Sequence, residues 1–497
     1  MSPRPLEPHT SAGWPGGLRL DLPVDRVPPD SLIQSANARP GFTHALEKVG
    51  GVRRLVDDAL GLINAAAVWF PHGSSGNAAE LVLVTAAGHL YTAPWNPTGA
   101  LTLTDQGAIS VPGWGFPAQP IVEFRSGNTE VLVLFEASGD TVATWDGATL
   151  TTGITAPANF GFGAVYHDRL YAILGPAFGG LPVAKSTLYG SKVGDPTKWA
   201  AADGGFSAVV GTYDGQGLTQ IATLAGSLLL FKTTSILRFS GSGPDDIAIS
   251  DKSEALSDQF GCAVPNSLCR TPKGLFCWSL DGPILVSPGG VRLVGEAIRP
   301  LWRALPSGAL ELLIAGYQPQ RRHVWCGLPT GTGQHRWYVW AVDTEQWYGP
   351  MYAQNGWSGC VSALTEDSNH RPESSRLLRV ASVIDVLDDP TLTTLDEVGT
   401  GYTLTVETGA LWPDAGAAIR SVEEVRLLGD IDAAAAPSLA ATSEQGTRSV
   451  AVDTTQGWQR LRPRMRGRQI TLTLTDATAK PVGLDAIDVL GRLERAG

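Results

Sequence analysis

A repeated three-strand pattern constrains this chain more than any other feature of its sequence, and the clearest copy covers residues 217–243. Three short apolar runs follow one another there, separated by the polar breaks Gly226-Ser227 and Lys232-Thr233-Thr234. Runs of this length bounded by Gly and Ser are typical of strands joined by hairpins and not of helices. Residues 228–230 are three Leu in a row, which indicates a strand covered on both faces.

Similar units recur along residues 51–395, and together they predict a β-propeller. Their turns are spaced about 30 to 60 residues apart, close to the length of one propeller blade. A radial arrangement also leaves only short, protected sheet edges. We therefore predict an all-β fold with a six-bladed β-propeller, in which residues 355–389 supply a closing strand or part of another blade. The six predicted units cover residues 63–93, 121–145, 163–191, 217–243, 266–287 and 312–348.

The segments on either side of the repeats have different patterns. Residues 1–50 are punctuated by proline and predict an extended lead-in. Short alternating runs mark the other end of the chain, where Thr471–Thr475 is typical of a half-buried strand. We predict an antiparallel β-sandwich over residues 396–497. Helical periodicity predicts one short helix at residues 295–305, with Pro300 in its first turn.

The composition argues against several classes of protein. The formal net charge is −11, whereas proteins that grip nucleic acid are usually basic. No apolar run approaches the roughly 20 residues that a membrane-spanning helix needs. Residues 1–10 lack the apolar stretch of a secretory signal, so none is expected. The five Cys follow no zinc-binding spacing, and we expect them to be buried and reduced.

The sequence contains no recognisable catalytic or cofactor motif. Its eight His have no metal-ligand spacing, and it lacks a phosphate-binding loop, a dinucleotide fingerprint and a nucleophile elbow. Acidic pairs occur at Asp245-Asp246, Asp388-Asp389 and Glu423-Glu424. We interpret the adjacent Asp residues as solvated turn formers, with catalytic carboxylates and calcium ligands as the alternatives, whereas Glu423 and Glu424 begin a predicted strand over Glu423–Leu428. The sequence therefore predicts no enzyme, no metal and no cofactor.

An arginine-rich run near the C-terminus is the most distinctive polar feature. Five Arg occupy every second position, so an extended backbone would place all five on one face. Pro463 within the run favours a sheet edge. Three interpretations stay open: a phosphate-binding strip, an interface to acidic groups of another subunit or partner, and a solvated edge protected by charge. We favour the interface, and its candidate residues are Arg460, Arg462, Arg464, Arg466, Arg468, Glu423 and Glu424.

Several short motifs link the chain to a known family. They are Asn37–Phe42 followed by Glu47–Gly50, Tyr166–Tyr171 followed by Leu188–Ser191 and Gly194–Trp199, the unit at residues 217–243, Gly261–Ser267, Ser279–Gly282, and the arginine-rich run followed by Gln469–Thr475. In this order they resemble the tail hub, or nozzle, proteins of short-tailed bacteriophages, also called packaged-DNA stabilisation proteins. The resemblance covers most of residues 37–490.

The resemblance implies a six-bladed propeller protomer, six copies of which form a ring in the tail of the virion. Such a ring would continue the channel of the portal and adaptor (head-tail connector) proteins, retain packaged double-stranded DNA, and conduct it non-specifically at ejection. It would also offer docking surfaces to tail fibre, spike or plug proteins. It would assemble in the host cytoplasm without inserting into a membrane. The negative charge fits this function, because an acidic lumen presents no traps for phosphate.

Two other functions are consistent with the residues. The Trp and loop content also suits a propeller that binds or processes carbohydrate, as a tail-tip or host-recognition protein would. Carboxylates and aromatic side chains that converge at one mouth of the propeller would favour that function. A scaffold propeller of a cell is the third interpretation.

Overall fold

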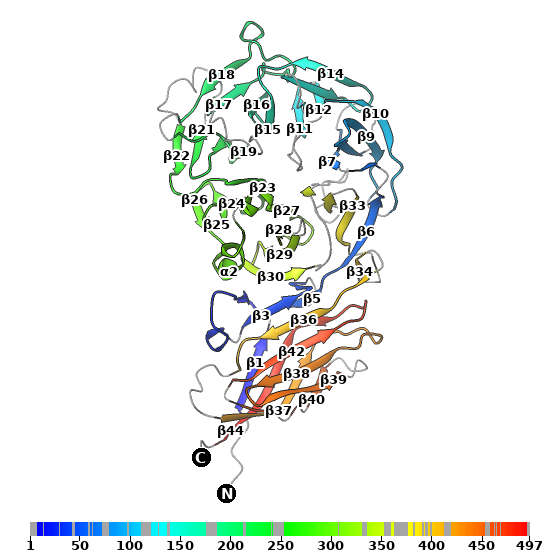
Figure 1. Ribbon diagram of the computed structural model, residues 1–497, viewed down its shortest axis with the longest axis vertical. Coiled ribbons are helices and arrows are strands. Elements are labelled where there is room, and N and C mark those ends of the chain that lie inside the picture. Colours follow the sequence, from blue (N-terminus) through cyan, green and yellow to red (C-terminus); the bar gives the residue numbers. More distant parts are fainter. Residues whose placement is uncertain are drawn as a thin grey trace.

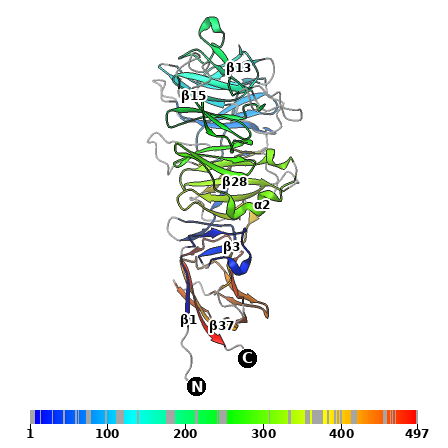
Figure 2. The same cartoon turned by 90° about the vertical axis from the view of Figure 1, so that its left-hand side faces the viewer.

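The structure, a computed structural model, is elongated and has two parts (Figures 1 and 2). Blades of antiparallel strands form a ring at one end, and a β-sandwich lies at the other end together with both chain termini. No helix among the described residues is both long and apolar enough to cross a bilayer. The structure describes residues 7–12, 14–28, 30–41, 45–57, 60–61, 63–71, 79–96, 99–110, 121–127, 129–136, 140–174, 186–211, 215–239, 241, 253–306, 308–330, 335–351, 359–361, 376–380, 383–389, 392, 396–397, 400–411, 419–452, 458–461, 463, 465–467 and 469–494.

Consecutive four-stranded antiparallel sheets along residues 63–351 form the first six blades, and the first strand of each blade is innermost. Every three-strand unit predicted from the sequence is present, and the first five gain a fourth, outer strand. These outer strands escaped prediction because they are short and half exposed, as Leu150–Thr155 illustrates. Residues 228–230 are at most 1% exposed, which confirms a strand covered on both faces.

The strands of the first six blades have the following bounds. Blades one to three contain β7 (Ile63–Trp69), β8 (Glu80–Thr85), β9 (His89–Pro94), β10 (Thr104–Ala108), β11 (Ile121–Ser126), β12 (Thr129–Phe135), β13 (Thr141–Trp145), β14 (Leu150–Thr155), β15 (Phe160–Tyr166), β16 (Arg169–Leu174), β17 (Thr187–Gly190) and β18 (Phe206–Val209). Blades four to six contain β19 (Gln220–Leu224), β20 (Ser227–Phe231), β21 (Ile236–Phe239), β22 (Ser253–Ser257), β23 (Val264–Thr271), β24 (Gly274–Ser279), β25 (Gly282–Ser287), β26 (Gly290–Leu293), β27 (Ile314–Gln318), β28 (His323–Pro329), β29 (His335–Ala341) and β30 (Gln346–Met351).

Within the described residues a seventh blade closes the ring, so the predicted count of six is wrong. Its first strand contacts the inner strands of blades six and one, and its outer strand comes from the N-terminal side of the propeller. The alternative that residues 355–389 form part of another blade is confirmed, since β31, β32 and β33 lie there, but the fourth strand was missed because it comes from the opposite end of the propeller segment. The blade consists of β31 (Gly359–Val361), β32 (Leu377–Val380), β33 (Ile384–Asp389) and β6 (Gly51–Val56), and β34 (Asp396–Glu397) and β35 (Thr400–Gly401) extend it.

The second part is a β-sandwich built from both ends of the chain. One sheet has the strand order β1-β44-β37-β40, with β41 also paired to β37, and the other has the order β2-β3-β36-β42-β38-β39. The N-terminal strands are β1 (Glu7–Ala12), β2 (Gly17–Leu18), β3 (Ser31–Ala36), β4 (Ala38–Arg39) and β5 (Leu46–Lys48). The C-terminal strands are β36 (Leu404–Thr408), β37 (Ile419–Leu428), β38 (Ser438–Ser443), β39 (Gly446–Ala451), β40 (Trp458–Leu461), β41 (Met465–Gly467), β42 (Thr471–Asp476), β43 (Gly483–Leu484) and β44 (Ala486–Glu494).

This arrangement corrects the prediction that residues 1–50 are a separate lead-in. β1 pairs with β44 and β3 pairs with β36, while β4 and β5 form a small sheet with β43. The N-terminal strands were missed because their partners lie at the other end of the chain. The propeller is therefore inserted between the two halves of the sandwich.

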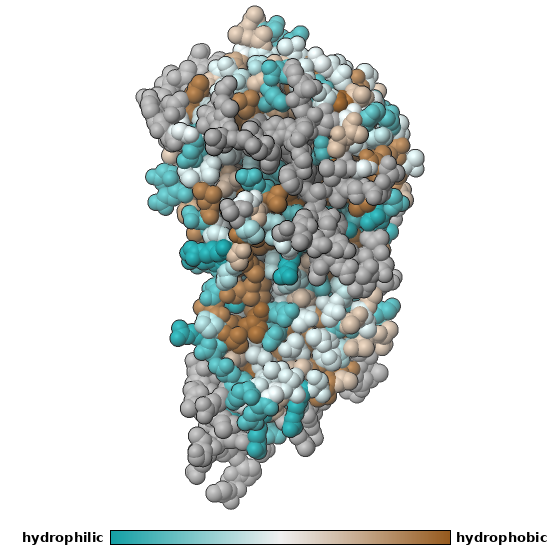
Figure 3. All heavy atoms as spheres, in the orientation of Figure 1, coloured by the Kyte–Doolittle hydropathy of each residue, from teal (hydrophilic) through white to brown (hydrophobic). Residues whose placement is uncertain are grey.

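Hydrophobic clusters lie between neighbouring blades, and one of them joins the propeller to the sandwich. That cluster combines Trp325, Tyr348 and Leu387 of blades six and seven with Leu404 and Val489 of the sandwich. On the face shown in Figure 3, apolar residues gather at the waist between the two parts. The shared core makes the contact between the parts continuous with the interior of each.

The predicted helix is present in two short pieces. A 3-10 turn, Glu296–Ile298, leads into α2, Arg299–Arg303, and Pro300 lies in the first turn as predicted. Ile298 is buried, and the apolar side of the helix packs on the core between blades five and six. Other 3-10 turns cover Val24–Arg26, Ala201–Asp203 and Ala309–Leu312.

We predict that Gly50→Ala destabilises the protein. A Cβ at Gly50 would lie 2.6 Å from Oδ1 and 3.0 Å from the carbonyl carbon of Asp388, which is fully buried and cannot move away. Overpacking of this kind costs about 2 kcal/mol. The control is Gly289→Ala, whose nearest neighbour would be the Ser287 Oγ at 3.9 Å and whose free energy of unfolding should change by less than about 0.5 kcal/mol. Urea unfolding followed by tryptophan fluorescence measures both, and equal effects of the two variants would contradict the prediction.

Candidate functional site

The arginine-rich run lies at one edge of the first sandwich sheet. β40 and β41 both pair with β37, and neither has another strand partner among the described residues. This confirms the predicted edge position. The run is not one continuous strand, because β40 ends at Leu461 and β41 begins at Met465. Pro463 falls in the break, where its missing N–H removes no ladder hydrogen bond.

Burial alternates along the run, as an extended backbone requires. The odd-numbered positions Leu461, Pro463, Met465 and Gly467 are buried. Arg466 is exposed, so it lies on the face away from the sandwich core. For Arg460 only the backbone is described, opposite Arg426 in the ladder. Arg462, Arg464 and Arg468 lie outside the described residues.

The acidic candidates Glu423 and Glu424 lie on β37, beside the run and in the same chain. The side chain of Glu424 is 9% exposed, and its Oε1 accepts a hydrogen bond from Arg426 Nε at 2.8 Å. The Ser421 hydroxyl donates to Glu423 Oε1 at 3.0 Å. Both carboxylates therefore have partners within the chain, and their role at an interface between subunits stays a prediction.

The structure corrects the interpretation of Asp388-Asp389 as a solvated turn. Asp388 and Asp389 end β33, and their side chains are at most 1% exposed. Arg39 Nη2 lies 2.6 Å from Asp388 Oδ1, so Asp388 belongs to an ion-pair network. Glu423 and Glu424 lie within β37, which confirms the predicted strand over Glu423–Leu428. The pair Asp245-Asp246 lies outside the described residues.

Four charged side chains, two buried and two half-buried, form a network where the propeller meets the sandwich. Arg39 of β4 lies 3.3 Å from Glu47 of β5, as well as bonding Asp388 of blade seven. Arg321, in the turn between β27 and β28, lies 3.2 Å from both of these carboxylates. The two cations and two anions cancel, and leaving buried Arg39 or Asp388 without its partner would cost about 3–5 kcal/mol. Sequence reasoning missed the network, because Arg39 and Asp388 are 349 residues apart.

The network sets the protonation of its neighbours. Burial alone would raise the pKa of Asp388, but Arg39 and Arg321 outweigh burial and hold it below its ordinary value. His323, on β28, has its pKa lowered to about 3, first by burial and then by the positive charges of the two arginines. The imidazole is therefore neutral at physiological pH.

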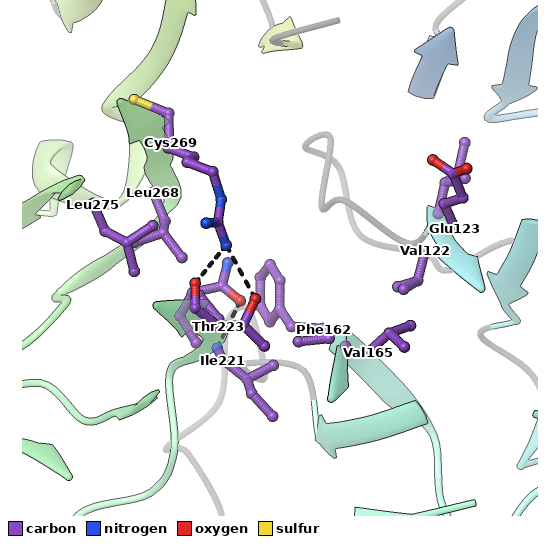
Figure 4. A pocket seen from close by; sticks show the side chains of 15 residues that line it. Val122, Glu123, Phe162, Val165, Ile221, Thr223, Leu268, Cys269 and Leu275 are labelled. Atoms are coloured by element: carbon purple, nitrogen blue, oxygen red, sulfur yellow. Dashed lines mark hydrogen bonds between the residues drawn. The ribbon is translucent and has the colours of Figure 1, made fainter. Parts of the chain in front are cut away.

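A cavity of about 300 Å³ lies among the inner strands of blades two to five (Figure 4). β11, β15, β19 and β23 line it, and Glu123 and Arg270 are the charged residues of the lining. Glycoside hydrolysis needs two convergent carboxylates, and the described lining holds one. No sequence pattern marked this cavity, because its strands converge only when the ring closes.

The described cysteines match the expectation of buried thiols. Cys262, Cys269, Cys277 and Cys326 are free and buried, and burial raises the pKa of the Cys277 thiol. In the part of the chain that the structure describes, no three His, Cys, Asp or Glu side chains gather as metal ligands would.

The motifs that carry the family resemblance shape turns and junctions. His167 and Asp168 have φ values of 46° and 56° and form the tight turn between β15 and β16. Arg169 then bonds the Gly204 carbonyl at 2.8 Å, which fixes a loop of the same blade. Asn37 Nδ2 donates to the Thr403 carbonyl at 2.8 Å. This bond links the segment that leads into the propeller with the segment that leaves it. These residues stabilise turns and junctions of the fold.

Comparisons with known proteins add no functional assignment. No family model matches the chain, and no curated protein matches it. Among solved structures, the extracellular domain of the putative one component system BT4673 from B. thetaiotaomicron is 11% identical with a TM-score of 0.42, covering 69% of this chain and 40% of that domain. BBS1N in complex with ARL6DN has the same identity and TM-score, and the match covers 69% of this chain and 97% of that one. The AfRom2 CNH domain is 10% identical with a TM-score of 0.38, and the match covers 69% of this chain and 99% of that one. Likeness at this level carries no argument about function.

We predict that buried His323 makes stability fall with acid. The unfolded chain binds a proton at this imidazole near pH 6.5, whereas the folded chain does so only near pH 3. Stability is therefore complete above pH 6.5 and decreases as the pH falls, by roughly 3 kcal/mol at pH 4. Asp388, with its lowered pKa, adds a loss in the same direction below about pH 4.

Urea unfolding at pH 7, 6, 5 and 4 measures this dependence. His323→Phe should remove most of the slope between pH 6.5 and pH 4, and His89→Gln, which changes an exposed histidine, should keep it. A His323→Phe protein with the wild-type slope would refute the assignment.

Proposed function

We propose that this protein is a structural subunit of a bacteriophage tail. Several copies form a ring-shaped hub or nozzle that continues the portal-adaptor channel, retains packaged DNA and conducts it at ejection. The motif resemblance supports this function, together with one structural observation: an arginine-bearing open sheet edge is joined through a shared core to an acidic propeller. The seven blades differ from the six that the resemblance implies, so the proposal depends on the assembly surface and not on the blade count.

Charge is divided unevenly along the chain. Residues 402–497 hold 11 Lys or Arg against 12 Asp or Glu, a net charge of −1, whereas the other residues hold 26 against 36, a net charge of −10. The arginine-rich edge of one copy therefore complements the acidic propeller of the next. Such a heterologous contact generates a ring when the rotation between copies closes.

The cavity among the inner strands of blades two to five has a volume of about 300 Å³, which is the size of a small-molecule site and not of a DNA duplex. Duplex DNA would therefore pass through an opening enclosed by several copies. An acidic wall suits this passage, because it holds no phosphate groups in place. Portal, adaptor, fibre, spike or plug proteins would bind the two faces of the ring.

We predict that Arg464→Glu combined with Arg466→Glu impairs ring formation more than folding. Reversing two charges of the edge places like charges against the acidic neighbour, while Arg466 is exposed and makes no contribution to the core. Negative-stain electron microscopy and analytical ultracentrifugation of the purified chain measure assembly, and circular dichroism measures folding.

The matched control is Arg303→Glu combined with Arg336→Glu, which reverses two exposed arginines of the propeller. It should assemble as the wild type does. Unchanged rings in the edge variant would show that the edge is merely solvated, and a wild-type chain that stays monomeric at every concentration and within virions would overturn the proposed function.

A further inference from the structure

The cavity among the inner strands presents one open cationic group. Thr223 and Glu123 stand on opposite sides of the space, with Phe162 and Val165 between them (Figure 4). Arg270 is exposed and lines the cavity beside Thr223. Its Nη2 donates to the carbonyl oxygen of Thr223 and, at 3.0 Å, to the Thr223 hydroxyl. These bonds hold the guanidinium group in place and leave its Nε and Nη1 without a hydrogen bond within the described part of the chain.

Blade two contains an equivalent arginine, Arg125, which has carboxylate partners that Arg270 does not have among the described residues. Arg125 and Arg270 are each the next-to-last residue of an inner strand, and each donates to a backbone carbonyl of the preceding blade. Arg125 reaches the Phe70 carbonyl at 2.7 Å. It also pairs with two carboxylates of its own blade, Glu123 and, at 3.0 Å, Glu130. Arg270 forms no ion pair with the described residues, so a carboxylate position filled in blade two is open in blade five.

We propose that this cavity binds a small sugar acid, whose carboxylate pairs with Arg270. The open Nε–H and Nη1–H of Arg270 lie on different edges of the planar guanidinium, so a ligand carboxylate accepts a charge-assisted hydrogen bond from one of these two groups. Phe162, Val165 and Ile221 provide an apolar floor for the body of the ligand. A volume of about 300 Å³ is at the lower limit of small-molecule sites and restricts the ligand to about one monosaccharide.

The opposite wall favours hydroxyl groups on the ligand. Glu123 is exposed there and forms an ion pair with Arg125, which also pairs with Glu130. Its carboxylate oxygens accept hydrogen bonds, so they suit hydroxyl groups on the ligand. A compact acid with hydroxyls at its far end satisfies both walls. This site is independent of the proposed ring, because it lies inside one propeller.

The test uses D-galacturonate as the probe, titrated into the full-length wild-type protein by isothermal titration calorimetry and saturation-transfer NMR. We expect measurable binding at millimolar concentration. D-galactose, which has a hydroxymethyl group in place of the carboxylate, should bind at least 10-fold more weakly, because the hydrogen bond between two charged groups is lost. Inorganic phosphate should not compete, because it lacks the body that the apolar floor contacts.

Three variants locate the site. Arg270→Gln should weaken galacturonate binding about 10- to 100-fold, and Arg270→Lys, which keeps the charge but not the planar guanidinium, should fall between it and wild type. Arg292→Gln, the same change on the outer strand of the same blade, should bind as wild type does. The melting temperature and ring assembly of each variant are measured alongside, so that a folding or assembly defect is separated from loss of the site. The proposal would be overturned if wild type did not bind galacturonate or bound galactose equally well. It would also be overturned if inorganic phosphate displaced galacturonate, or if a folded Arg270→Gln protein bound galacturonate as wild type does.

Discussion

A network of four charges with zero net sum joins the two parts of the molecule at its waist. Arg39 and Glu47 belong to the N-terminal strands, Arg321 to blade six and Asp388 to blade seven. Arg39 and Asp388 are buried, so each of these two charges is tolerable only while its partners are in place. The network therefore admits one arrangement of three chain segments that are remote in sequence.

The closure of the propeller depends on the same residues. β6 begins directly after Gly50, whose N–H donates to Asp388, and β6 pairs with the strand that ends at Asp388 and Asp389. The last blade is thus closed at the point where the chain enters from the sandwich. Tyr402, where the chain returns, donates its hydroxyl to the carbonyl oxygens of Val49 and Gly50. The two segments that connect the sandwich to the propeller are therefore hydrogen-bonded to each other. A force applied to the sandwich of a subunit in the proposed ring would be transmitted to the closing blade through these bonds.

Blades two and five repeat the same structural arginine but differ in the carboxylates around it. The inner strands of blades two and five place Arg125 and Arg270 at equivalent positions, and both link neighbouring blades. Only the surroundings differ, since carboxylates of its own blade neutralise the first arginine and not the second. A blade can therefore keep its structural bond and still present a charged group to the central cavity.

The sequence by itself determined the local elements. Alternation and Gly-rich turns located the inner three strands of the first six blades, the short helix around Pro300 and the edge position of the arginine-rich run, because these depend on neighbouring residues. Tertiary structure alone decided which strand completes the seventh blade, the placement of β1, β2 and β3 in the sandwich, the burial of Asp388 and Asp389, and the cavity beside Arg270. Each of these joins segments far apart in the chain, and no local pattern records which distant strand will supply a hydrogen-bonded edge or which distant charge will balance a buried one.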